Sequence, residues 1–370
     1  MKFIFKPAPN YKDNRSTNSI MFELTIGLLI VLVYSLYNAY TISLNNMIHI
    51  ILLSITCIVT SLVVEVLYAL VIKKKPLVFL KGSYPWVTSL IIILICPSNT
   101  TIYAIFIATI VGIIFGKLVF GGFGNNIFNP AGVGRAVITL SFAATISPDV
   151  ISSATPMQSL ASMNWIVKPD VFNEFVSQFG GLSNLFIGNY YGGVGETSFL
   201  VIGLVGIVLA IRRVIDYRIP LVYMSVIFIG SSIVAFTNGM GLYYSLYHIF
   251  SGGAIFGAVF MLTDPVTNPT SISGRCLFAM GAGFITLVIR LAGNYPEGVL
   301  FSILLMNMMT PVIDRLIEGV QLEKIKKLVL ANVVMAVIGF GIIFGISLTL
   351  DNTDSASVGD DVLVIERVLL

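Results

Sequence analysis

Six ionisable residues lie within or beside the long apolar runs of this sequence, and these are Glu65, Lys117, Arg135, Asp264, Arg290 and Glu297. A charged side chain in hydrocarbon is costly, so such residues usually pair with one another or mark the path of an ion. The long basic side chains could instead extend their charges to the membrane surface, and this alternative stays open.

Two breaks in the apolar pattern are candidates for lining a ligand. The segment 263–269 reads TDPVTNP, and its two prolines prevent a regular helix around Asp264. Irregular backbone at membrane depth must be buried in protein or line a cavity. The Asp264 carboxylate would therefore cap a half-helix or lie beside a cofactor or an ion.

The second break, residues 121–130, reads GGFGNNIFNP. Its three glycines let the backbone approach a ligand closely. Its Asn side chains offer donors and acceptors that suit a flat heteroaromatic ring. No strand is expected before it and no Gly-Lys-Ser/Thr follows it, so it is neither a dinucleotide-binding turn nor a Walker loop. It predicts a ligand-lining segment with the candidates Gly124, Asn125, Asn126 and Asn129.

A short polar stretch, Ser152-Ser153-Ala154-Thr155, comes directly before a proline. Taken alone, this pattern is typical of a loop or a helix cap. No base stands nearby that would make Thr155 a nucleophile, so no catalytic residue is predicted. No metal site is predicted either, because the chain has two histidines, no CxxC motif and three widely separated cysteines, Cys57, Cys96 and Cys276.

The composition predicts a membrane protein built from helices. Of 370 residues, 56% are hydrophobic and 11% are charged, and the mean hydropathy is +0.95. Soluble domains carry about 25% charged residues. Apolar runs of about 20 residues match the thickness of a bilayer, and each must satisfy its own backbone hydrogen bonds as a helix. The small net charge of +3 gives no indication of a nucleic-acid partner, so the expected surroundings are lipid.

The apolar runs predict ten membrane spans and one more near the C-terminus. The expected spans are 22–40, 47–72, a shorter piece at 84–96, 101–120, 126–147, 196–211, 219–236, 244–263, 276–292, 296–314 and 328–350. With the N-terminus inside, the basic clusters at 73–75, 212–213 and 315–327 all fall on the cytoplasmic side, as the positive-inside rule requires. The loop 148–195 and the acidic tail then lie outside.

Sequence features recur at an offset of 168 to 169 residues. Ser83 and Pro97 reappear as Ser251 and Pro265, and Gly124-Asn125 reappears as Gly293-Asn294. This echo predicts two inverted halves of five spans, with binding sites near their interface. The alternative is that Gly and Pro are simply frequent in membrane helices. The expected division is a cytoplasmic segment 1–21, a first membrane repeat 22–147, an extracytoplasmic loop 148–195, a second repeat 196–316, a linker with an extra span 317–350, and an acidic tail 351–370.

Four blocks of the sequence resemble the RnfD proteins, which belong to the Rnf complex, the ion-pumping ferredoxin:NAD oxidoreductase. That family is related to the NqrB proteins of the sodium-pumping NADH:quinone oxidoreductase. The resemblance covers residues 1 to about 316, and its blocks are 121–136 (GGFGNNIFNPAGVGRA), 188–198 (GNYYGGVGETS), 251–269 (SGGAIFGAVFMLTDPVTNP) and 290–314. It implies the fold of the urea-transporter superfamily, which consists of two inverted five-helix halves. The span at 328–350 would be an addition to that fold.

The resemblance also implies a covalent flavin. In the family, the phosphate of FMN is joined to the Thr of an S-G-A-T motif, which stands here as Ser152-Ser153-Ala154-Thr155, with Ser153 in place of Gly. Thr155 would be the acceptor, and a separate flavin transferase would attach the group. Arg135 and Asp264 join the residues of the 121–130 break as further candidates for flavin contact. Riboflavin or another second, noncovalent flavin is a further expectation at that break.

The expected function is therefore electron transfer through FMN, coupled to transport of Na⁺ or H⁺, in a multi-pass protein of the bacterial cytoplasmic (inner) membrane. Glu65, Asp264 and Glu297 would supply the coupling charges. The expected partners are the other membrane and peripheral subunits of the Rnf complex. The chain would be one component of a translocase, without a complete active site of its own. Two alternatives stay open: a channel or solute transporter of the same fold without flavin, and a purely structural membrane subunit.

Overall fold

The computed structural model describes residues 15–145, 147, 150–151, 154–293, 295, 298–317 and 321–350, and the regular secondary structure of this part of the chain is helical, with one isolated bridge between Pro97 and Gly193. The expectation of an all-α polytopic membrane protein is confirmed at that level. Six of the described helices are long and apolar enough to cross a membrane, and two bent helix pairs raise the number to as many as eight.

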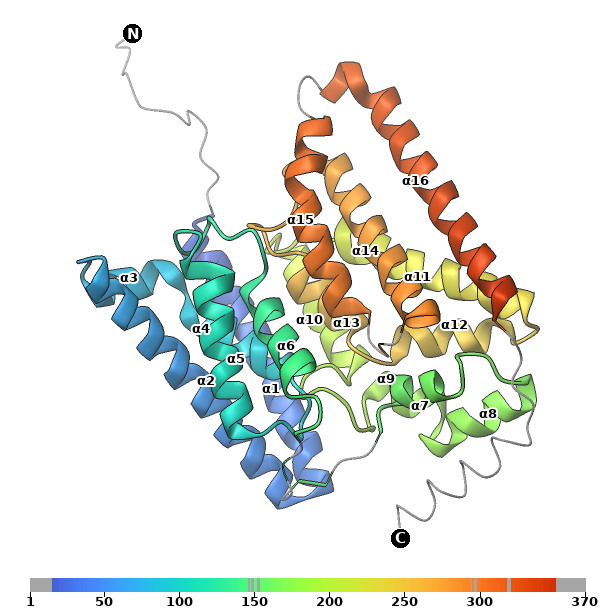
Figure 1. The fold of residues 1–370 in the computed structure, drawn as a ribbon, viewed down its shortest axis with the longest axis horizontal. Helices are drawn as coiled ribbons and strands as arrows, with labels where there is room; N and C mark the ends of the chain where they lie inside the picture. Colours follow the sequence, from blue (N-terminus) through green and yellow to red (C-terminus); the bar gives the residue numbers. More distant parts are fainter. Residues whose placement is uncertain are drawn as a thin grey trace.

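The first group of helices covers the N-terminal part of the chain (Figure 1). Its elements are α1 (Thr17–Ile42), α2 (Leu44–Val71), α3 (Pro76–Ser83), α4 (Pro85–Ile95), α5 (Ile102–Ile113) with the π-helix η1 (Ile114–Leu118), and α6 (Pro130–Ser141). We call the end where α1 begins and α2 ends the basic end, because Arg15 and Lys73–Lys75 lie there.

The second group covers the C-terminal part. Its elements are α10 (Phe199–Ile211), α11 (Arg218–Thr237), α12 (Gly241–Phe250), α13 (Ala254–Phe256) with the π-helix η2 (Gly257–Met261), α14 (Ile272–Ala292), α15 (Val299–Ile317) and α16 (Gln321–Thr349). The two groups meet where α1 packs on α10 and where α6 packs on α15. The last helix, α16, packs against α11 and α14 on the outside of its group (Figure 1).

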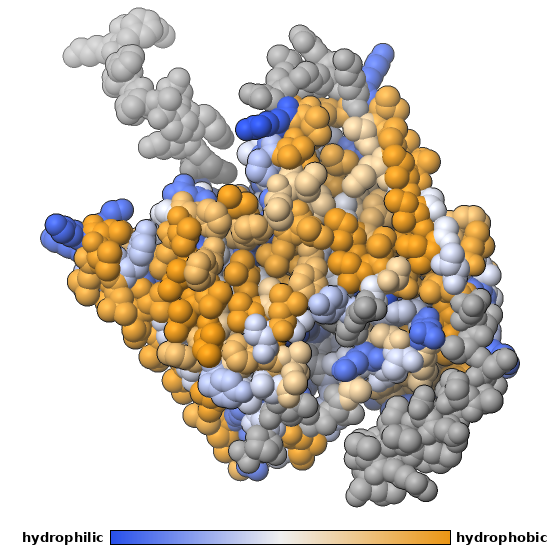
Figure 2. Space-filling view, in the orientation of Figure 1, coloured by the Kyte–Doolittle hydropathy of each residue, from blue (hydrophilic) through white to orange (hydrophobic). Residues whose placement is uncertain are grey.

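Three short helices lie between the groups in sequence and at the end of the molecule opposite the basic end (Figure 1). They are α7 (Pro156–Ser162), α8 (Pro169–Gln178) and α9 (Gly181–Ile187). Figure 2 shows orange, apolar side chains over the long helices and paler or blue side chains over α7 and α8. Large apolar side chains such as Phe22 and Val33 are 67% and 66% exposed, as suits contact with lipid rather than water.

Both bent pairs break where the backbone must leave the helical region. Between α3 and α4 the chain bends by 50° at Tyr84, which has a φ of 51° and directly precedes Pro85. A residue before proline is disfavoured in the helical conformation. Between α12 and α13 the bend is 58°, and Gly252 supplies a φ of 74°. Ser83 and Ser251, one pair of the sequence echo, therefore mark the two bends.

Three of the eleven expected spans correspond to helices shorter than the roughly 20 residues of a typical membrane crossing. The helix pair α5–η1 spans residues 102–118, α10 has 13 residues, and α6 has 12 where the sequence predicted a span over 126–147. The cause at α6 is local, since Asn129 caps the helix and Pro130 occupies its first turn. Helix α6 is held tightly against its neighbours, because a Cβ at Gly116 would lie 2.6 Å from Pro130 Cα.

Candidate functional site

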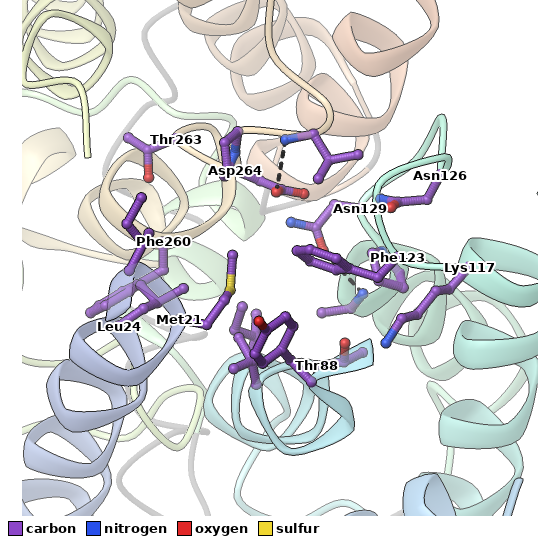
Figure 3. A pocket seen from close by; sticks show the side chains of 18 of the residues that line it. Met21, Leu24, Thr88, Lys117, Phe123, Asn126, Asn129, Phe260, Thr263 and Asp264 are labelled. Atoms are coloured by element: carbon purple, nitrogen blue, oxygen red, sulfur yellow. Dashed lines mark hydrogen bonds between the residues drawn. The ribbon is translucent and has the colours of Figure 1, made fainter. Parts of the chain in front are cut away.

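The inner cavity lies at the basic end, between the two helix groups. It is small, about 60 Å³, and both breaks that the sequence singled out contribute to its wall. Asn126 and Asn129 come from the first break, and Thr263 and Asp264 come from the second (Figure 3). Lys117 of η1 also points toward this space (Figure 3). Two segments that are more than 130 residues apart therefore form one site.

Asp264 caps the turn that follows it. Its Oδ1 accepts a hydrogen bond from the backbone N–H of Val266 at 3.2 Å, and its Oδ2 accepts one from the Thr267 hydroxyl at 3.3 Å. The capping role that the sequence left open is therefore present. The carboxylate also lines the inner cavity, and its place beside a cofactor or an ion stays a prediction.

The asparagines of the first break mostly stabilise the break itself. Asn129 Oδ1 accepts hydrogen bonds from the N–H groups of Ala131 and Gly132 at 3.0 and 3.4 Å, and it thereby caps α6. Asn126 Nδ2 donates to the Phe128 carbonyl at 3.0 Å. Gly124 supplies a positive φ of 93°. Asn125 is not among the residues that line the inner cavity.

Lys117 and Glu65 form a buried ion pair beside this cavity. Lys117 Nζ lies 2.7 Å from Glu65 Oε1, and the two side chains are 2% and 0% exposed. Lys117 Nζ also donates to the Ser83 carbonyl at the end of α3. Extension of Lys117 to the membrane surface is therefore wrong as an interpretation. Burying both charges is compensated because each meets an opposite charge or a carbonyl dipole.

The outer cavity lies at the opposite end and is larger, about 430 Å³. Both helix groups and the short helices line it. Thr155 and Gln158 contribute from α7, Arg135 contributes from α6, and Glu196 contributes from the loop before α10. The remaining walls include the 97–100 turn after α4 and the residues 295 and 299–301 at the start of α15. This is the space beside the residue that the sequence selected as a flavin acceptor.

Thr155 occupies the N-cap position of α7. Its Oγ1 accepts a hydrogen bond from the Gln158 N–H at 3.2 Å, as the cap interpretation predicted. The following residue, Pro156, is held by the second helix group, because Tyr247 Oη of α12 donates to its carbonyl at 2.5 Å. Tyr244 Oη similarly donates to the Trp165 carbonyl at 3.1 Å. Two buried tyrosines thus fix the Thr155 segment against the bent pair α12–α13.

A loop segment closes the outer cavity from the side. Val194 N–H donates to the Cys96 carbonyl at 2.8 Å, and Gly195 N–H donates to the Leu94 carbonyl at 2.7 Å. The Glu196 carboxylate is enclosed by backbone, because a Cβ at Gly193 or Gly253 would lie 2.5 Å from one of its oxygens. The residues 193–196 belong to a block that the sequence identified only by resemblance, and the site chemistry of Glu196 was not foreseen.

Arg290 is fully buried in the second helix group, so extension to the surface is wrong for this residue as well. Its Nη1 donates to the His248 carbonyl in the last turn of α12 at 3.0 Å, while Nε and Nη2 have no partner in the part of the chain that the structure describes. The His248 ring stacks on Trp165 with ring centroids 5.9 Å apart. Arg290 therefore stabilises the end of α12 at its bend.

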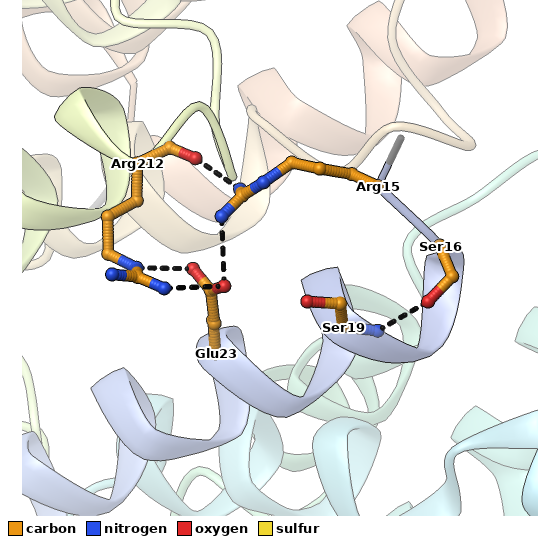
Figure 4. Close-up of polar contacts among 5 residues, drawn as sticks. All are labelled: Arg15, Ser16, Ser19, Glu23 and Arg212. Carbon is orange, nitrogen blue, oxygen red and sulfur yellow. Dashed lines mark hydrogen bonds and ion pairs between the residues drawn. The ribbon is translucent and has the colours of Figure 1, made fainter. Parts of the chain in front are cut away.

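Ion pairs join the two groups at the basic end. Glu23 of α1 accepts hydrogen bonds from Arg212 Nε at 2.8 Å and Arg15 Nη2 at 2.9 Å (Figure 4). Arg15 also donates to the Arg212 carbonyl. Ser16 caps α1 by accepting from the Ser19 N–H at 3.2 Å (Figure 4). These contacts connect the first helix of one group to the end of α10.

Several predicted site residues lie outside the described residues, namely Ser152, Ser153 and Glu297. Ala154 is exposed beside Thr155. The candidates therefore divide between two cavities. Asn126, Asn129 and Asp264 line the inner one, whereas Thr155 and Arg135 line the outer one. Within the described chain, no cluster of His, Cys, Asp or Glu could hold a metal ion.

Comparison with known proteins identifies the family. Residues 4–323 match the NQR2, RnfD, RnfE family. The chain is 32% identical over 332 residues to the D subunit of the proton-translocating ferredoxin:NAD(+) oxidoreductase complex of Clostridium ljungdahlii, covering 86% of this chain and 96% of that protein. It is 31% identical over 331 residues to the D subunit of the Na(+)-translocating complex of Acetobacterium woodii, with the same two coverages of 86% and 96%. The D subunit of the ion-translocating oxidoreductase complex of Pseudomonas aeruginosa is 34% identical over 261 residues, which are 65% of this chain and 75% of that protein. The chain belongs to the NQR2, RnfD, RnfE family.

Proposed function

We propose that this protein is the RnfD component of an Rnf-type, ion-translocating ferredoxin:NAD oxidoreductase complex, and that it transfers electrons through FMN esterified to Thr155. The observation that carries the proposal is the position of the Thr155 hydroxyl at the wall of a cavity of about 430 Å³ between the two helix groups. Small-molecule sites in proteins typically have volumes of roughly 300–1,000 Å³. The relatives named above are components of such complexes.

The residues around Thr155 fit a tethered flavin nucleotide. Thr155 is only partly buried, so its hydroxyl is accessible to a flavin transferase. The aromatic side chains of Tyr190, Tyr191 and Phe301 line the cavity and provide flat apolar surfaces for a ring. When bound, the flavin supplies the capacity to accept and release electrons. The protein supplies the tether, the cavity that limits solvent, and the charges near the ring.

The buried charges at the inner cavity are our candidates for ion coupling. Asp264 lines that cavity, and Glu65 lies beside it in its ion pair with Lys117. Glu297 stays in this set as a prediction, although it lies outside the described residues. A cation that enters near these carboxylates would offset negative charge gained by a reduced flavin, because opposite charges attract strongly where water is scarce. The coupling ion is Na⁺ or H⁺.

We further propose that the two helix groups are inverted five-helix halves of the urea-transporter type, with α16 as an addition. The inner cavity combines a break from each group, and residues of both groups line the outer cavity, which is the arrangement expected for binding sites between inverted repeats. The basic end would face the cytoplasm and Thr155 the opposite side of the bacterial inner membrane. The remaining partners would be the other Rnf subunits.

A second, noncovalent flavin such as riboflavin would need more room than the inner cavity has. Its volume of about 60 Å³ is far below the roughly 300 Å³ at the lower end of small-molecule sites. A flavin at the 121–130 break would therefore require the two breaks to move apart. Extraction of noncovalent flavin from the purified complex, with and without Asn126→Ala, tests this part of the proposal.

In-gel fluorescence tests the covalent flavin directly. The full chain, produced together with a flavin transferase, should give a fluorescent band after denaturation and a mass increase equal to FMN minus water. Thr155→Ala should abolish both, and Thr139→Ala should abolish neither, although Thr139 lines the same cavity. Loss of the band only in Thr155→Ala supports the electron carrier. A wild-type chain without flavin would favour the alternative of a channel or transporter of the same fold.

A further inference from the structure

Arg135 brings a positive charge to the outer cavity and forms no ion pair there with a described residue. The residue is half-buried on α6 and lines the cavity together with Thr155. Its guanidinium forms no hydrogen bond or ion pair with any part of the chain that the structure describes. A partly buried guanidinium at membrane depth is costly unless an anion or a ring of dipoles compensates it. No described residue therefore supplies a counter-charge for Arg135.

Helix packing fixes the position of Arg135 beside the outer cavity. The neighbouring residue Gly134 fits against α5 so closely that a Cβ there would lie 3.0 Å from the Ala108 carbonyl oxygen. One turn later the Thr139 hydroxyl donates to the Arg135 carbonyl at 3.1 Å. The backbone of α6 thus has little freedom to turn Arg135 away from the cavity. The guanidinium is placed beside the cavity rather than able to leave it.

The chemistry of the cavity wall leaves the charge of Arg135 available. Among the described lining residues, Glu196 is the other charged one, and it forms no ion pair with Arg135. The Glu196 carboxylate lies against the backbone of Gly193 and Gly253 instead. The other polar groups on the wall are neutral hydroxyls and amides, such as Thr155 and Gln158. The cavity therefore offers an anion the guanidinium of Arg135 and several neutral donors, while the one described carboxylate on its wall, Glu196, lies against backbone.

We infer that Arg135 binds the negative charge of the flavin nucleotide attached to Thr155. This inference rests on the proposed function, because the anion enters the cavity through the Thr155 ester. A guanidinium is suited to this task because its planar set of donors can bind two acceptors at once. These acceptors are either two phosphate oxygens or a ring nitrogen and the carbonyl oxygen beside it. Arg135 acts as a positioning residue that holds the tethered group against α6.

The anionic charge has two sources in such a nucleotide. The phosphodiester carries its charge at all times, whereas the ring gains one only on reduction. Contact with the phosphodiester should hold the ring in place with little effect on how easily it is reduced. Contact with the ring should favour the reduced form, by about the tenfold that one hydrogen bond to a charged group can contribute.

The test uses the assembled complex with the variants Arg135→Gln, Arg135→Lys and, as a matched control, Arg315→Gln, which removes an exposed charge far from the outer cavity. In-gel fluorescence first establishes that each chain carries flavin. Fluorescence anisotropy of the native protein then reports the motion of the ring, and a redox titration reports the ratio of reduced to oxidised flavin at a fixed potential.

We expect Arg135→Gln to lower the anisotropy or to shift that ratio about tenfold towards oxidised flavin, with recovery in Arg135→Lys and no change in Arg315→Gln. Lower anisotropy alone identifies the phosphodiester, and a shifted ratio identifies the ring. A flavinylated Arg135→Gln chain with both properties unchanged would overturn this inference and leave the Thr155 proposal intact. A wild-type chain without flavin would overturn the Thr155 proposal instead.

Discussion

The two bent helix pairs use the same device with different electrostatics. In each, a buried cation from a neighbouring helix donates to a carbonyl at or near the C-terminal end of the first helix: Lys117 to Ser83 at the end of α3, and Arg290 to His248 near the end of α12. The C-terminal end of a helix favours positive charge, so both contacts stabilise a bend. Lys117 also has Glu65 as its counter-charge, whereas Arg290 has no acidic partner among the described residues.

We call the bend between α3 and α4, where the buried cation has an acidic counter-charge, the closed joint. We call the bend between α12 and α13, where the buried cation has none among the described residues, the open joint. The first bend is held by an ion pair inside the bundle, in which Glu65 Oε2 has no partner among the described residues. The second leaves two nitrogens of a buried guanidinium without a partner among the described residues, and its surroundings are aromatic: Trp165, Tyr244 and the His248 ring. The closed joint lies by the inner cavity, and the open one lies next to the segment that bears Thr155. We expect the first bend to resist change and the second to tolerate it.

The largest effect is expected from Lys117→Met. This change removes the cation and leaves the Glu65 carboxylate buried without compensation. Breaking a buried ion pair in this way typically lowers the free energy of unfolding by about 3–5 kcal/mol. Denaturant titration of the purified chain in detergent measures the loss. The double variant with Glu65→Leu removes both charges and should regain most of it. A double variant as unstable as Lys117→Met would show that the pair is not what stabilises the first bend.

A smaller effect is expected from Arg290→Met. The change removes one hydrogen bond to the His248 carbonyl, but no acidic group among the described residues is left uncompensated. A net loss of about 1–2 kcal/mol in the free energy of unfolding follows, because the lost hydrogen bond is partly offset by relief of a buried charge. The same titration compares it with Lys117→Met. Equal losses would contradict the difference between the two joints and would indicate an anionic partner for Arg290.

The positions of the two bends could be predicted from the sequence better than the pairing of the buried residues that stabilise them. Prolines and glycines at 83–85 and 251–253 signal the bends, and Asn129-Pro130 signals the start of α6, although the apolar run suggested a span from 126. Glu65 and Lys117 are separated by 52 positions in the sequence, and nothing in that separation signals that the two charges meet. Only the packing of α2 beside α5 creates that pair.

The two cavities could likewise be predicted from the sequence only in part. Each break could be recognised as irregular backbone, but their convergence on one small cavity depends on how the helix groups dock. Thr155 was identified by resemblance, since as a residue it is an ordinary helix cap. Glu196 and Tyr247 carry no local pattern that marks them as site residues, because their positions depend on contacts with backbone far away in the chain.

The smallest effect is expected from Asp216 at the basic end, whose partly exposed contacts with Arg275 and Arg218 lie within the second helix group. Burial tends to raise the pKa of Asp216, but hydrogen bonds from Arg275 and the Arg218 backbone outweigh it and hold the pKa below its ordinary value of 3.8. A carboxyl with a lowered pKa in the folded state stabilises the fold above pH 3.8, and this contribution is lost as the pH falls below that value.

Asp216→Asn should therefore leave a shallower acid-side decline in the melting temperature between about pH 5 and pH 3 than the wild-type chain shows. Exposed ion pairs contribute little, typically about 0–1 kcal/mol, so the change at neutral pH should be small. Asp314→Asn is a comparison in the same basic region, because Asp314 accepts hydrogen bonds from Thr270 and forms no ion pair among the described residues. An acid-side decline identical in Asp216→Asn and wild type would mean that Asp216 adds no pH-dependent stability, contrary to its lowered pKa.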